Sequence, residues 1–209
     1  SGDYAEAIVG SDGCLYLVTV DVMGKGVSAA FLAVMIRTAL RILLETPIPL
    51  SELAPSLNSI LCGLVGDMTL FATFAISKID SKQQQLEVVN AGHCNTILVP
   101  IGDHPLDEVA PSAPPMGLFK ECTYTIERFP LNAVQRVIMV SDGIFEWETP
   151  EGIWGWPAFL DFCERNRSLP SKPFMDHLSK EISEGSGKAP ISDDQTCIIW
   201  SNLQTDITS

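Results

Sequence analysis

Four acidic clusters recur along the chain, each beside glycines or at one end of an apolar run. They are Ser1-Gly2-Asp3-Tyr4, Asp21-Val22-Met23-Gly24-Lys25-Gly26, Ser141-Asp142-Gly143 and Ser192-Asp193-Asp194-Gln195-Thr196. Carboxylates that are distant in sequence but can converge in space are what a site for two hard divalent cations requires. Two such cations about 4 Å apart can share a water that ionises near neutral pH. The clusters therefore predict a site that hydrolyses a phosphate ester.

Each cluster taken alone has a simpler explanation. Asp-Gly is a common turn dipeptide, because Asp bonds its own backbone and Gly tolerates positive φ. That explanation suffices for Asp12-Gly13, and for Asp142-Gly143 considered by itself. Asp193 by itself is typical of a solvated loop. The hypothesis of a metal site therefore depends on the ordered set and not on any one member.

The composition indicates one acidic globular domain that spans residues 1–209. A chain of 209 residues can bury one substantial core but is too short for two. Hydrophobic residues make up 46% of it, and its formal charge is −13. This charge excludes nucleic acid as a partner, since phosphate backbones are bound through clustered Lys and Arg. It also suits a cation site, where metal neutralises carboxylates.

The cysteines and the hydropathy pattern indicate a reducing compartment. No C-x-x-C pair occurs among the six cysteines, which favours reduced thiols in the core over disulfides or zinc ligands. They are Cys14, Cys62, Cys94, Cys122, Cys163 and Cys197. No stretch resembles a signal peptide or a membrane span. Because the first motif lies at the very start, we expect the catalytic part of a longer sensor protein with an N-terminal regulatory domain. We expect it to be cytoplasmic, either free or as the cytoplasmic domain of a membrane-anchored protein.

The order of the predicted elements indicates an antiparallel α+β fold. Strand pairs and helix pairs follow one another without β-α-β alternation, so a doubly wound sheet does not fit. Helices are predicted over residues 28–45, 51–64, 157–166 and 172–183. Strands are predicted over residues 4–10, 14–20, 70–77, 85–90, 96–99, 122–129, 135–140 and 196–200. Residues 102–115 are rich in Pro, Asp and Gly, which predicts a loop.

Six motifs together resemble one family, the SpoIIE/RsbU-type branch of the PPM (type 2C) serine/threonine phosphatases. The first cluster and residues 21–30 resemble its first metal motif and its metal-binding turn with the following helix. The other four are Asn90-Ala91-Gly92-His93, Pro115-Met116-Gly117-Leu118, Ser141-Asp142-Gly143-Ile144-Phe145-Glu146 and Asp193-Asp194-Gln195-Thr196. The resemblance implies a four-layer α-β-β-α sandwich of two mainly antiparallel sheets flanked by helix pairs, with metals at one end between the sheets.

The resemblance also implies a ligand set for two Mn²⁺ or Mg²⁺ ions. Asp21 would bridge both ions, and the backbone carbonyl of Val22 would bind one of them. Asp142 and Asp193 would ligate the first ion and Asp3 the second, while Asp194 would support the site. The catalytic residues would then be Asp21, Asp142 and Asp193, because they hold the cations that activate the water.

Three positions leave alternatives open. Met23 stands where the wider family often has a His proposed as general acid, so a metal-bound water is the alternative proton donor. Glu6 stands where the branch usually has a second Asp, and is either a ligand through water or an exposed strand residue. His93 either organises its loop through hydrogen bonds or lies near the metals as a neutral imidazole.

By resemblance, the substrate is a phosphoserine or phosphothreonine on an anti-sigma-factor antagonist of the STAS type, in a bacterial partner-switching pathway. Two other functions compete. An ATP-binding anti-sigma kinase-like domain has a box of the form Asp-x-Gly-x-Gly, whereas the spacing here is one residue longer. A catalytically inactive scaffold of the same fold would have lost an acidic position. The helix over residues 28–45 is apolar on more than one face, so it is either thoroughly buried or meets a second subunit or a regulatory domain.

Overall fold

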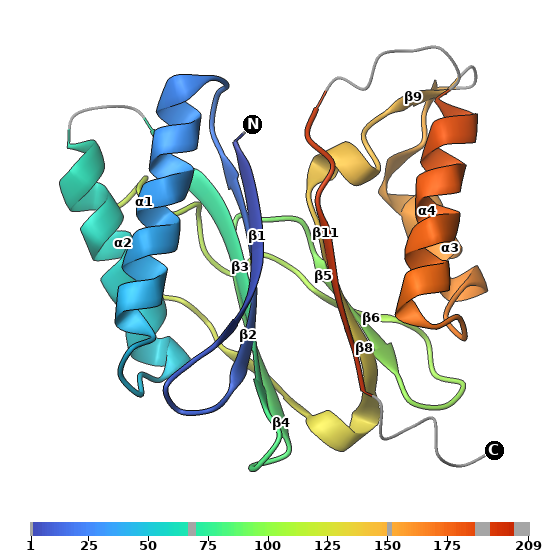
Figure 1. Cartoon of the computed structure of the whole chain (residues 1–209), viewed down its shortest axis with the longest axis horizontal. Coiled ribbons are helices and arrows are strands. Elements are labelled where there is room, and N and C mark those ends of the chain that lie inside the picture. The colour runs from blue at the N-terminus through green and yellow to red at the C-terminus, as the bar shows by residue number, and fades with distance from the viewer. Residues whose placement is uncertain (1, 67–69, 150–151, 187–192, 203–209) are drawn as a thin grey trace.

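A computed structural model describes residues 2–66, 70–149, 152–186 and 193–202. In this part of the chain, two antiparallel sheets pack face to face and a pair of helices covers each outer face (Figure 1). This arrangement confirms the predicted four-layer α-β-β-α sandwich. Ser1 and Ser192, which belong to the first and fourth acidic clusters, lie outside the described residues.

The first sheet has the strand order β1-β2-β3-β4-β7 and is covered by α1 and α2. Each neighbouring pair is antiparallel, and the β1–β2 and β3–β4 pairs are hairpins joined by short turns. Its elements are β1 (Asp3–Val9), β2 (Leu15–Val22), β3 (Ala72–Asp80), β4 (Gln85–Ala91), β7 (Glu127–Pro130), α1 (Val27–Leu43) and α2 (Leu50–Val65).

The second sheet has the strand order β11-β8-β5-β6 and is covered by α3 and α4. A small two-stranded sheet and two 3-10 helices, η1 and η2, complete the described elements. They are β5 (Thr96–Pro100), β6 (Asp107–Val109), η1 (Leu131–Ala133), β8 (Val134–Val140), η2 (Asp142–Ile144), β9 (Glu148–Thr149), β10 (Gly152–Ile153), α3 (Gly155–Arg165), α4 (Ser171–Gly185) and β11 (Cys197–Ser201).

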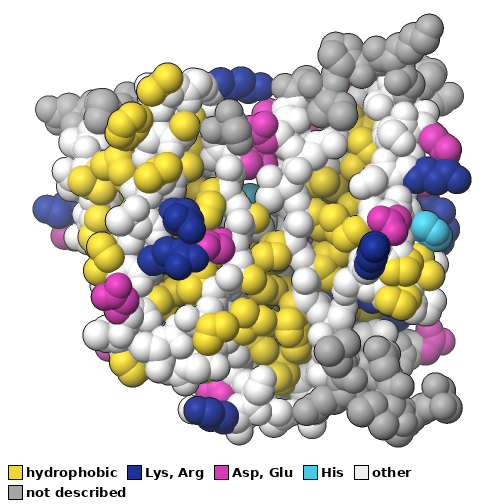
Figure 2. Space-filling model, viewed as in Figure 1, with side chains coloured by type: hydrophobic (Ala, Val, Ile, Leu, Met, Phe, Trp, Pro, Cys, Tyr) yellow, Lys and Arg dark blue, Asp and Glu magenta, His cyan; other side chains and the backbone are white. Residues whose placement is uncertain are grey.

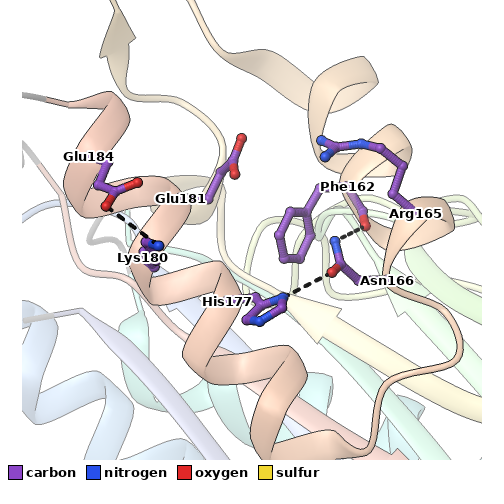
Figure 3. Close-up of a pocket in the computed structure, with 7 residues that line it drawn as sticks. All are labelled: Phe162, Arg165, Asn166, His177, Lys180, Glu181 and Glu184. Carbon is purple, nitrogen blue, oxygen red and sulfur yellow. Dashed lines mark hydrogen bonds and ion pairs between the residues drawn. The ribbon is translucent and has the colours of Figure 1, made fainter.

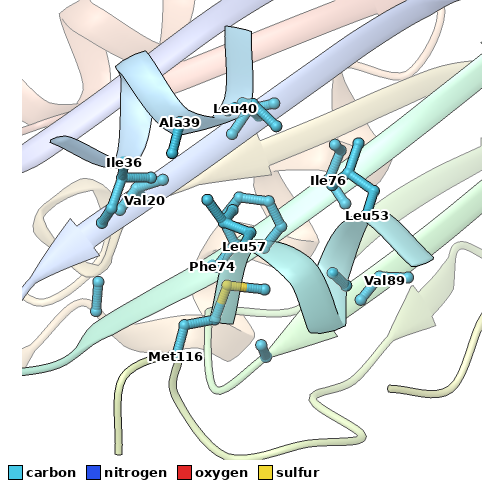
Figure 4. Packing of buried hydrophobic residues seen from close by; sticks show 14 of the residues in the cluster. Val20, Ile36, Ala39, Leu40, Leu53, Leu57, Phe74, Ile76, Val89 and Met116 are labelled. Atoms are coloured by element: carbon cyan, nitrogen blue, oxygen red, sulfur yellow. The ribbon is translucent and has the colours of Figure 1, made fainter. Parts of the chain in front are cut away.

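Alternation along β2 explains how one strand serves two layers. Side chains in a strand point to opposite faces in turn. Val20 faces the helices and packs with Ile36 of α1 and Phe74 of β3 (Figure 4). Leu17 faces the other sheet, where it joins an apolar cluster that includes Met139 of β8. Asp21 has the same parity as Leu17, so the alternation also turns its carboxylate toward the space between the sheets.

Three predicted segments differ from the structure. The loop predicted over residues 102–115 contains β6, which pairs with the edge of β5. The strand predicted over residues 122–129 is formed only from Glu127 onward, because Tyr124 inserts into the core beneath α1 and α2 instead of joining a ladder. The short β9–β10 pair was not predicted, since two-residue strands carry no readable alternation.

The expectation that α1 is thoroughly buried is wrong for part of its surface. Its buried residues, Ala29, Leu32, Ile36, Ala39 and Leu40, form one stripe against the sheet and α2. Other apolar residues of the helix point to solvent, and Figure 2 shows hydrophobic side chains exposed over this helix pair. The exposed ones are Val27, Phe31, Val34 and Ile42, each at least 60% exposed.

No helix among the described residues combines the length and the apolar composition needed to cross a membrane. The longest, α1, is interrupted by two arginines, Arg37 and Arg41.

Candidate metal centre

The acidic clusters meet at one edge of the sandwich, where four strand ends lie together (Figure 1). Asp3 begins β1 and lies directly opposite Asp21, near the end of β2. Asp142 follows the last residue of β8, and Asp193 and Asp194 come shortly before β11, which pairs with β8. Each sheet therefore brings acidic side chains to the same edge, and Figure 2 shows acidic side chains in the seam between the two halves.

Two hydrogen bonds tie the first cluster to the fourth across the seam. The Thr196 hydroxyl donates to Asp3 Oδ2 at 2.8 Å, and the Gly2 amide donates to Asp194 Oδ2 at 3.2 Å. The residues involved are more than 190 positions apart in sequence. The start of β1 is thereby held against the segment that leads into β11.

The third and fourth clusters are packed backbone to backbone. A Cβ atom on Gly143 would lie 2.1 Å from the carbonyl oxygen of Asp194, so only glycine fits there. The Ser141 hydroxyl donates to the same carbonyl at 3.3 Å and accepts from the Thr196 amide at 3.0 Å. Gln195 Nε2 donates to the Gly143 carbonyl at 3.0 Å. The Asp-Gly pair is thus more than a turn, since its glycine permits this contact.

The carboxylates at this edge repel one another. Burial, together with the charges of Asp3, Asp142 and Asp193, raises the pKa of Asp21 to about 7. Burial also raises the pKa of Asp3, with Asp194 and Asp142 adding to the effect and the hydroxyls of Ser141 and Thr196 opposing it. Such a cluster is electrostatically costly unless a cation neutralises it.

The donor set fits hard divalent cations. All five side chains offer carboxylate oxygens, which Mg²⁺ and Mn²⁺ prefer over thiolate and imidazole groups. Lys25 Nζ lies 3.4 Å from Asp193 Oδ1, but both side chains are more than half exposed, so the pair neutralises little of the buried charge. The described residues contain no group of three acidic, His or Cys side chains already close enough to bind one common ion.

The Val22 side chain is buried in the core beneath α1 and α2, whereas its backbone lies at the acidic edge between the two sheets. Its amide donates to the Gly2 carbonyl at 3.3 Å. A Cβ atom on Gly2 would lie 2.8 Å from the Val22 carbonyl oxygen, so Gly2 permits the close approach of the two chains. The carbonyl predicted as a ligand therefore belongs to the same edge as the carboxylates.

His93 lies beside this edge but makes neutral hydrogen bonds. Its Nδ1 is 2.7 Å from the Thr73 hydroxyl, and Thr73 is the β3 partner of Asp21. Burial lowers the pKa of His93 to about 4, so the imidazole is neutral, and a neighbouring Val140 carbonyl only partly offsets this. Nε2 makes no hydrogen bond of normal geometry among the described residues. The ring contact is thus with β3 beside Asp21 and not within the His93 loop, which favours the alternative of a neutral imidazole near the proposed metal centre.

Asn90 organises the loop that carries His93, a role the sequence did not reveal. Its Oδ1 accepts from the His93 amide at 2.9 Å, and its Nδ2 donates to the Cys94 carbonyl at 2.9 Å. Gly92, with φ of 70°, packs so closely that a Cβ would lie 2.6 Å from the Pro115 ring. The Asn90-Ala91-Gly92-His93 and Pro115-Met116-Gly117-Leu118 motifs are therefore in contact.

Glu6 lies on the opposite face of β1 from Asp3. Its carboxylate accepts hydrogen bonds from Arg37 and Arg41 of α1 and from Tyr4. The hydrogen bond from Arg41 lowers the pKa of Glu6 to about 2, helped by Tyr4 and Arg37 and opposed by burial. Neither sequence alternative for Glu6 described this contact, since it depends on where the helix lies.

The cysteines are free thiols, as the sequence predicted. Burial raises the pKa of Cys14, Cys94 and Cys197 to about 12. A thiol with such a pKa is not a thiolate at neutral pH and cannot act as a nucleophile. These three thiols are therefore core residues and not candidate nucleophiles.

A separate hollow of about 230 Å³ lies between α3 and α4, and Figure 3 shows its lining. Its polar side chains pair locally: His177 Nδ1 is 3.2 Å from Asn166 Oδ1, and Lys180 lies 3.8 Å from Glu184. No residue of the acidic clusters lines it. This hollow is a paired polar surface between two helices and offers no substitute for the metal centre.

The comparisons with known proteins agree with this geometry. Residues 11–201 match the family model described as Stage II sporulation protein E (SpoIIE). The chain is 24% identical to Protein IcfG of a Synechocystis species, with 87% of this chain and 33% of that protein aligned. It is 26% identical to Phosphoserine phosphatase RsbU of Bacillus subtilis, with 79% and 49% aligned.

The solved SiaA-PP2C domain of Pseudomonas aeruginosa has the same fold, with a TM-score of 0.83 at 16% identity, covering 96% of this chain and 80% of that one. The chain spans about half or less of the length of the two curated relatives. The family model nevertheless covers nearly all of it. This chain therefore belongs to the SpoIIE family and has the fold of the PP2C phosphatase domains.

Proposed function

We propose that this chain is a metal-dependent protein phosphatase that hydrolyses phosphoserine or phosphothreonine. The carrying observation is the gathering of five carboxylates from four sequence clusters at one edge, where the pKa of Asp21 is raised to about 7. Carboxylates with a purely structural role are normally paired with cationic side chains. A group of carboxylates held close together at an electrostatic cost therefore supports a functional role for this edge. Family membership supports the same activity.

Two Mn²⁺ or Mg²⁺ ions would supply an ionised water as nucleophile and would offset the negative charge of the phosphate. Asp21 would hold both ions, because it lies between Asp3 and the clusters of the second sheet. Asp142 and Asp193 would hold the first ion, and Asp3 and the Val22 carbonyl would complete the site. Asp194 would support these ligands instead of binding an ion itself, because its carboxylate already accepts a hydrogen bond from the Gly2 amide.

No covalent intermediate is needed in this reaction. The buried thiols are protonated at neutral pH. Met23, in the turn after Asp21, cannot donate a proton to the leaving group. Proton delivery by water is the remaining route, and we assign no side chain as general acid.

The name of one relative and the resemblance of the motifs support a proposal for the substrate class. One of them is named a phosphoserine phosphatase, RsbU, and the motifs resemble the partner-switching branch. We therefore propose a phosphorylated STAS-type anti-sigma-factor antagonist as substrate, acted on in the cytoplasm. A regulatory domain elsewhere in the full protein would control the activity. Any attachment of the phosphatase domain to a membrane would run through that regulatory domain.

The exposed apolar face of α1 is the proposed surface for a second copy of the chain or for that regulatory domain. A groove of about 320 Å³ lies between α1 and α2, and Phe31 and Leu64 are among its lining residues. It begins at Val27, directly after the glycines of the metal turn. Phe31→Asp and Val34→Asp should change both the mass in solution and the Mn²⁺ affinity without unfolding the domain. A change in stability alone would contradict this surface assignment.

The test of the proposed activity is hydrolysis of an aryl phosphate and of a phosphoserine peptide, each with Mn²⁺ or with a chelator. We expect turnover with Mn²⁺, none with the chelator, and none in Asp21→Asn. Asp12→Asn serves as the matched control, because it also removes one half-buried carboxylate of the β1–β2 hairpin but lies outside the acidic edge.

Each competing function predicts a different result. Tight binding of an ATP analogue, with no phosphatase turnover, would favour the kinase-like domain. Mn²⁺ binding without turnover of either substrate would favour an inactive scaffold. Turnover that persists in the chelator would contradict metal dependence.

A further inference from the structure

Strand β1 presents different chemistry on its two faces. Asp3 faces the second sheet, where Thr196 donates to it. Tyr4, Glu6 and Ile8 face the other way, and Tyr4 and Ile8 pack in the apolar cluster that contains α1. The strand that supplies one edge of the acidic centre therefore also carries the surface on which α1 rests.

Glu6, Tyr4, Arg37 and Arg41 form a cluster that we call the Glu6 clamp. Arg37 donates to the two carboxylate oxygens at 3.1 and 3.2 Å, and Arg41 donates to the same two oxygens, through Nε at 3.3 Å and through a shorter contact. The Tyr4 hydroxyl donates as well. The Glu6 side chain is 18% exposed, while the two arginine side chains are nearly half exposed. The arginines therefore extend from the surface of α1 to a carboxylate that is largely shielded from solvent. Multiple charge-assisted bonds to one acceptor are stronger and better defined than a single exposed pair.

A second contact joins β1 and α1 on the other side of Asp3. A Cβ atom on Gly2 would lie 2.8 Å from the Val22 carbonyl oxygen and 3.7 Å from the Ala29 Cβ in the first turn of α1. Gly2 is thus enclosed between the turn after Asp21 and the start of the helix. The Glu6 clamp fixes the same helix two to three turns further along, at Arg37 and Arg41.

We propose that the Glu6 clamp is a positioning device that holds α1 against β1, so that Asp3 and the Val22 carbonyl stay in the arrangement that binds the cations. This inference rests on the proposed metal-dependent function and adds the residues that control it. Glu6, Arg37 and Arg41 would be positioning residues, since none of them lies with the acidic ligands. A movement of α1 along β1 must break the clamp and also shift Ala29 of the helix against Gly2.

The alternative is that the clamp is an ordinary surface ion cluster, which contributes little to stability or to the position of α1. The first sheet contains a matched pair for comparison. Arg128 donates to Glu87 at 2.9 Å across β4 and β7, with side chains 53% and 16% exposed, nearly the same as in the clamp. Glu87 and Arg128 do not touch α1 or the acidic edge, so this pair reports the effect of losing an ion pair alone.

The experiment compares the wild-type protein with Glu6→Gln, with the double variant Arg37→Gln/Arg41→Gln, and with the control Glu87→Gln. Hydrogen–deuterium exchange of the metal-free proteins reports how firmly α1 and β1 are held. Calorimetric titration with Mn²⁺ alone reports the affinity of the centre. We expect both clamp variants to show faster exchange in β1 and the first turns of α1, and at least about fivefold weaker Mn²⁺ binding. The control should match wild type in both measurements.

Unchanged exchange in both clamp variants would overturn the proposal, and so would faster exchange with unchanged Mn²⁺ affinity. An equal loss of affinity in Glu87→Gln would assign the effect to general charge instead. If the wild-type protein binds no Mn²⁺, the proposed metal centre fails and the positioning role falls with it. The exchange data would then still show whether the clamp holds the helix, so the two failures are distinguishable.

Discussion

The two ends of the β1–β2 hairpin each carry a half-buried aspartate, but with opposite electrostatic surroundings. At the turn, Asp12 accepts hydrogen bonds from the Lys78 ammonium at 2.8 Å, the Tyr16 hydroxyl at 2.8 Å and the Cys14 amide at 3.0 Å. Burial raises the pKa of Asp12, but these donors outweigh it and lower the pKa to about 2. At the far end, burial and three other carboxylates raise the pKa of Asp21 to about 7.

The difference separates a structural carboxylate from a functional one. Asp12 has its cation supplied by the protein, so the ionised form is stable in the folded chain. Asp21 has carboxylates as neighbours, so its ionised form is stable only when a cation comes from outside. Both residues are followed within three positions by glycine, and in sequence both resemble turns. Neighbours from distant segments, and not local sequence, therefore distinguish Asp21, the proposed metal ligand, from Asp12.

The largest effect is expected for Asp142→Ala. Removing a ligand lowers both water activation and charge stabilisation, so kcat/KM should fall by at least about a hundredfold. Glu6→Ala, which loosens the Glu6 clamp but removes no ligand, should cost at least about 2 kcal/mol less in transition-state terms. Steady-state kinetics with a phosphopeptide measures both. Equal losses would mean that Glu6 is itself a ligand.

Gly143→Ala should disturb the acidic edge through packing alone. The new methyl group would lie 2.1 Å from the Asp194 carbonyl oxygen, so the segment before β11 must move, at a cost of about 1–3 kcal/mol. Urea unfolding and Mn²⁺ titration should both show losses. The control is Gly63→Ala in α2, where no atom lies within 4 Å of the added Cβ and a helical alanine is favoured. Wild-type Mn²⁺ affinity in Gly143→Ala would show that the close contact is not needed.

Asp12→Asn should lower the stability of the domain without affecting the acidic edge. It removes the partner of Lys78, so the free energy of unfolding should fall by about 2 kcal/mol. Mn²⁺ affinity and turnover should stay at the wild-type level. Chemical denaturation and metal titration of the same preparation measure the two quantities. Loss of metal binding in this variant would break the distinction between the two hairpin ends.

The pH dependence of this stabilisation has a definite sign. Asp12 has a lower pKa in the folded chain, about 2, than its ordinary value of 3.8. Its contribution is therefore fully present above about pH 4 and is lost as the pH falls toward 2, since the unfolded chain takes up the proton first. Unfolding measured across this range should be steeper in wild type than in Asp12→Asn. Parallel curves would contradict the assigned role of Lys78.

The sequence predicted the layers of the fold because hydrophobic alternation and helix signals are local properties. The parity of Leu17 and Asp21 along β2 could be read directly, and it turned out to place Asp21 between the sheets. The five acidic residues were named from their motifs, and the structure brings them to one edge. Their roles as ligands remain predictions.

Contacts between distant segments could not be read from the sequence. Arg37 and Arg41 formed a polar ridge in the helical pattern, but their partner, Glu6, depends on how the helix crosses β1. The exposed side of α1 was also unpredictable, because periodicity shows which faces are apolar and not which of them is covered.

Calorimetric titration of Mn²⁺ into the wild-type protein, Asp21→Asn and Asp12→Asn tests the central claim most directly. The account predicts Mn²⁺ binding in wild type and in Asp12→Asn, and binding at least about tenfold weaker in Asp21→Asn, whose unfolding midpoint without metal should not be lower than that of wild type. The same Mn²⁺ affinity in all three proteins, or no binding in wild type, would contradict it.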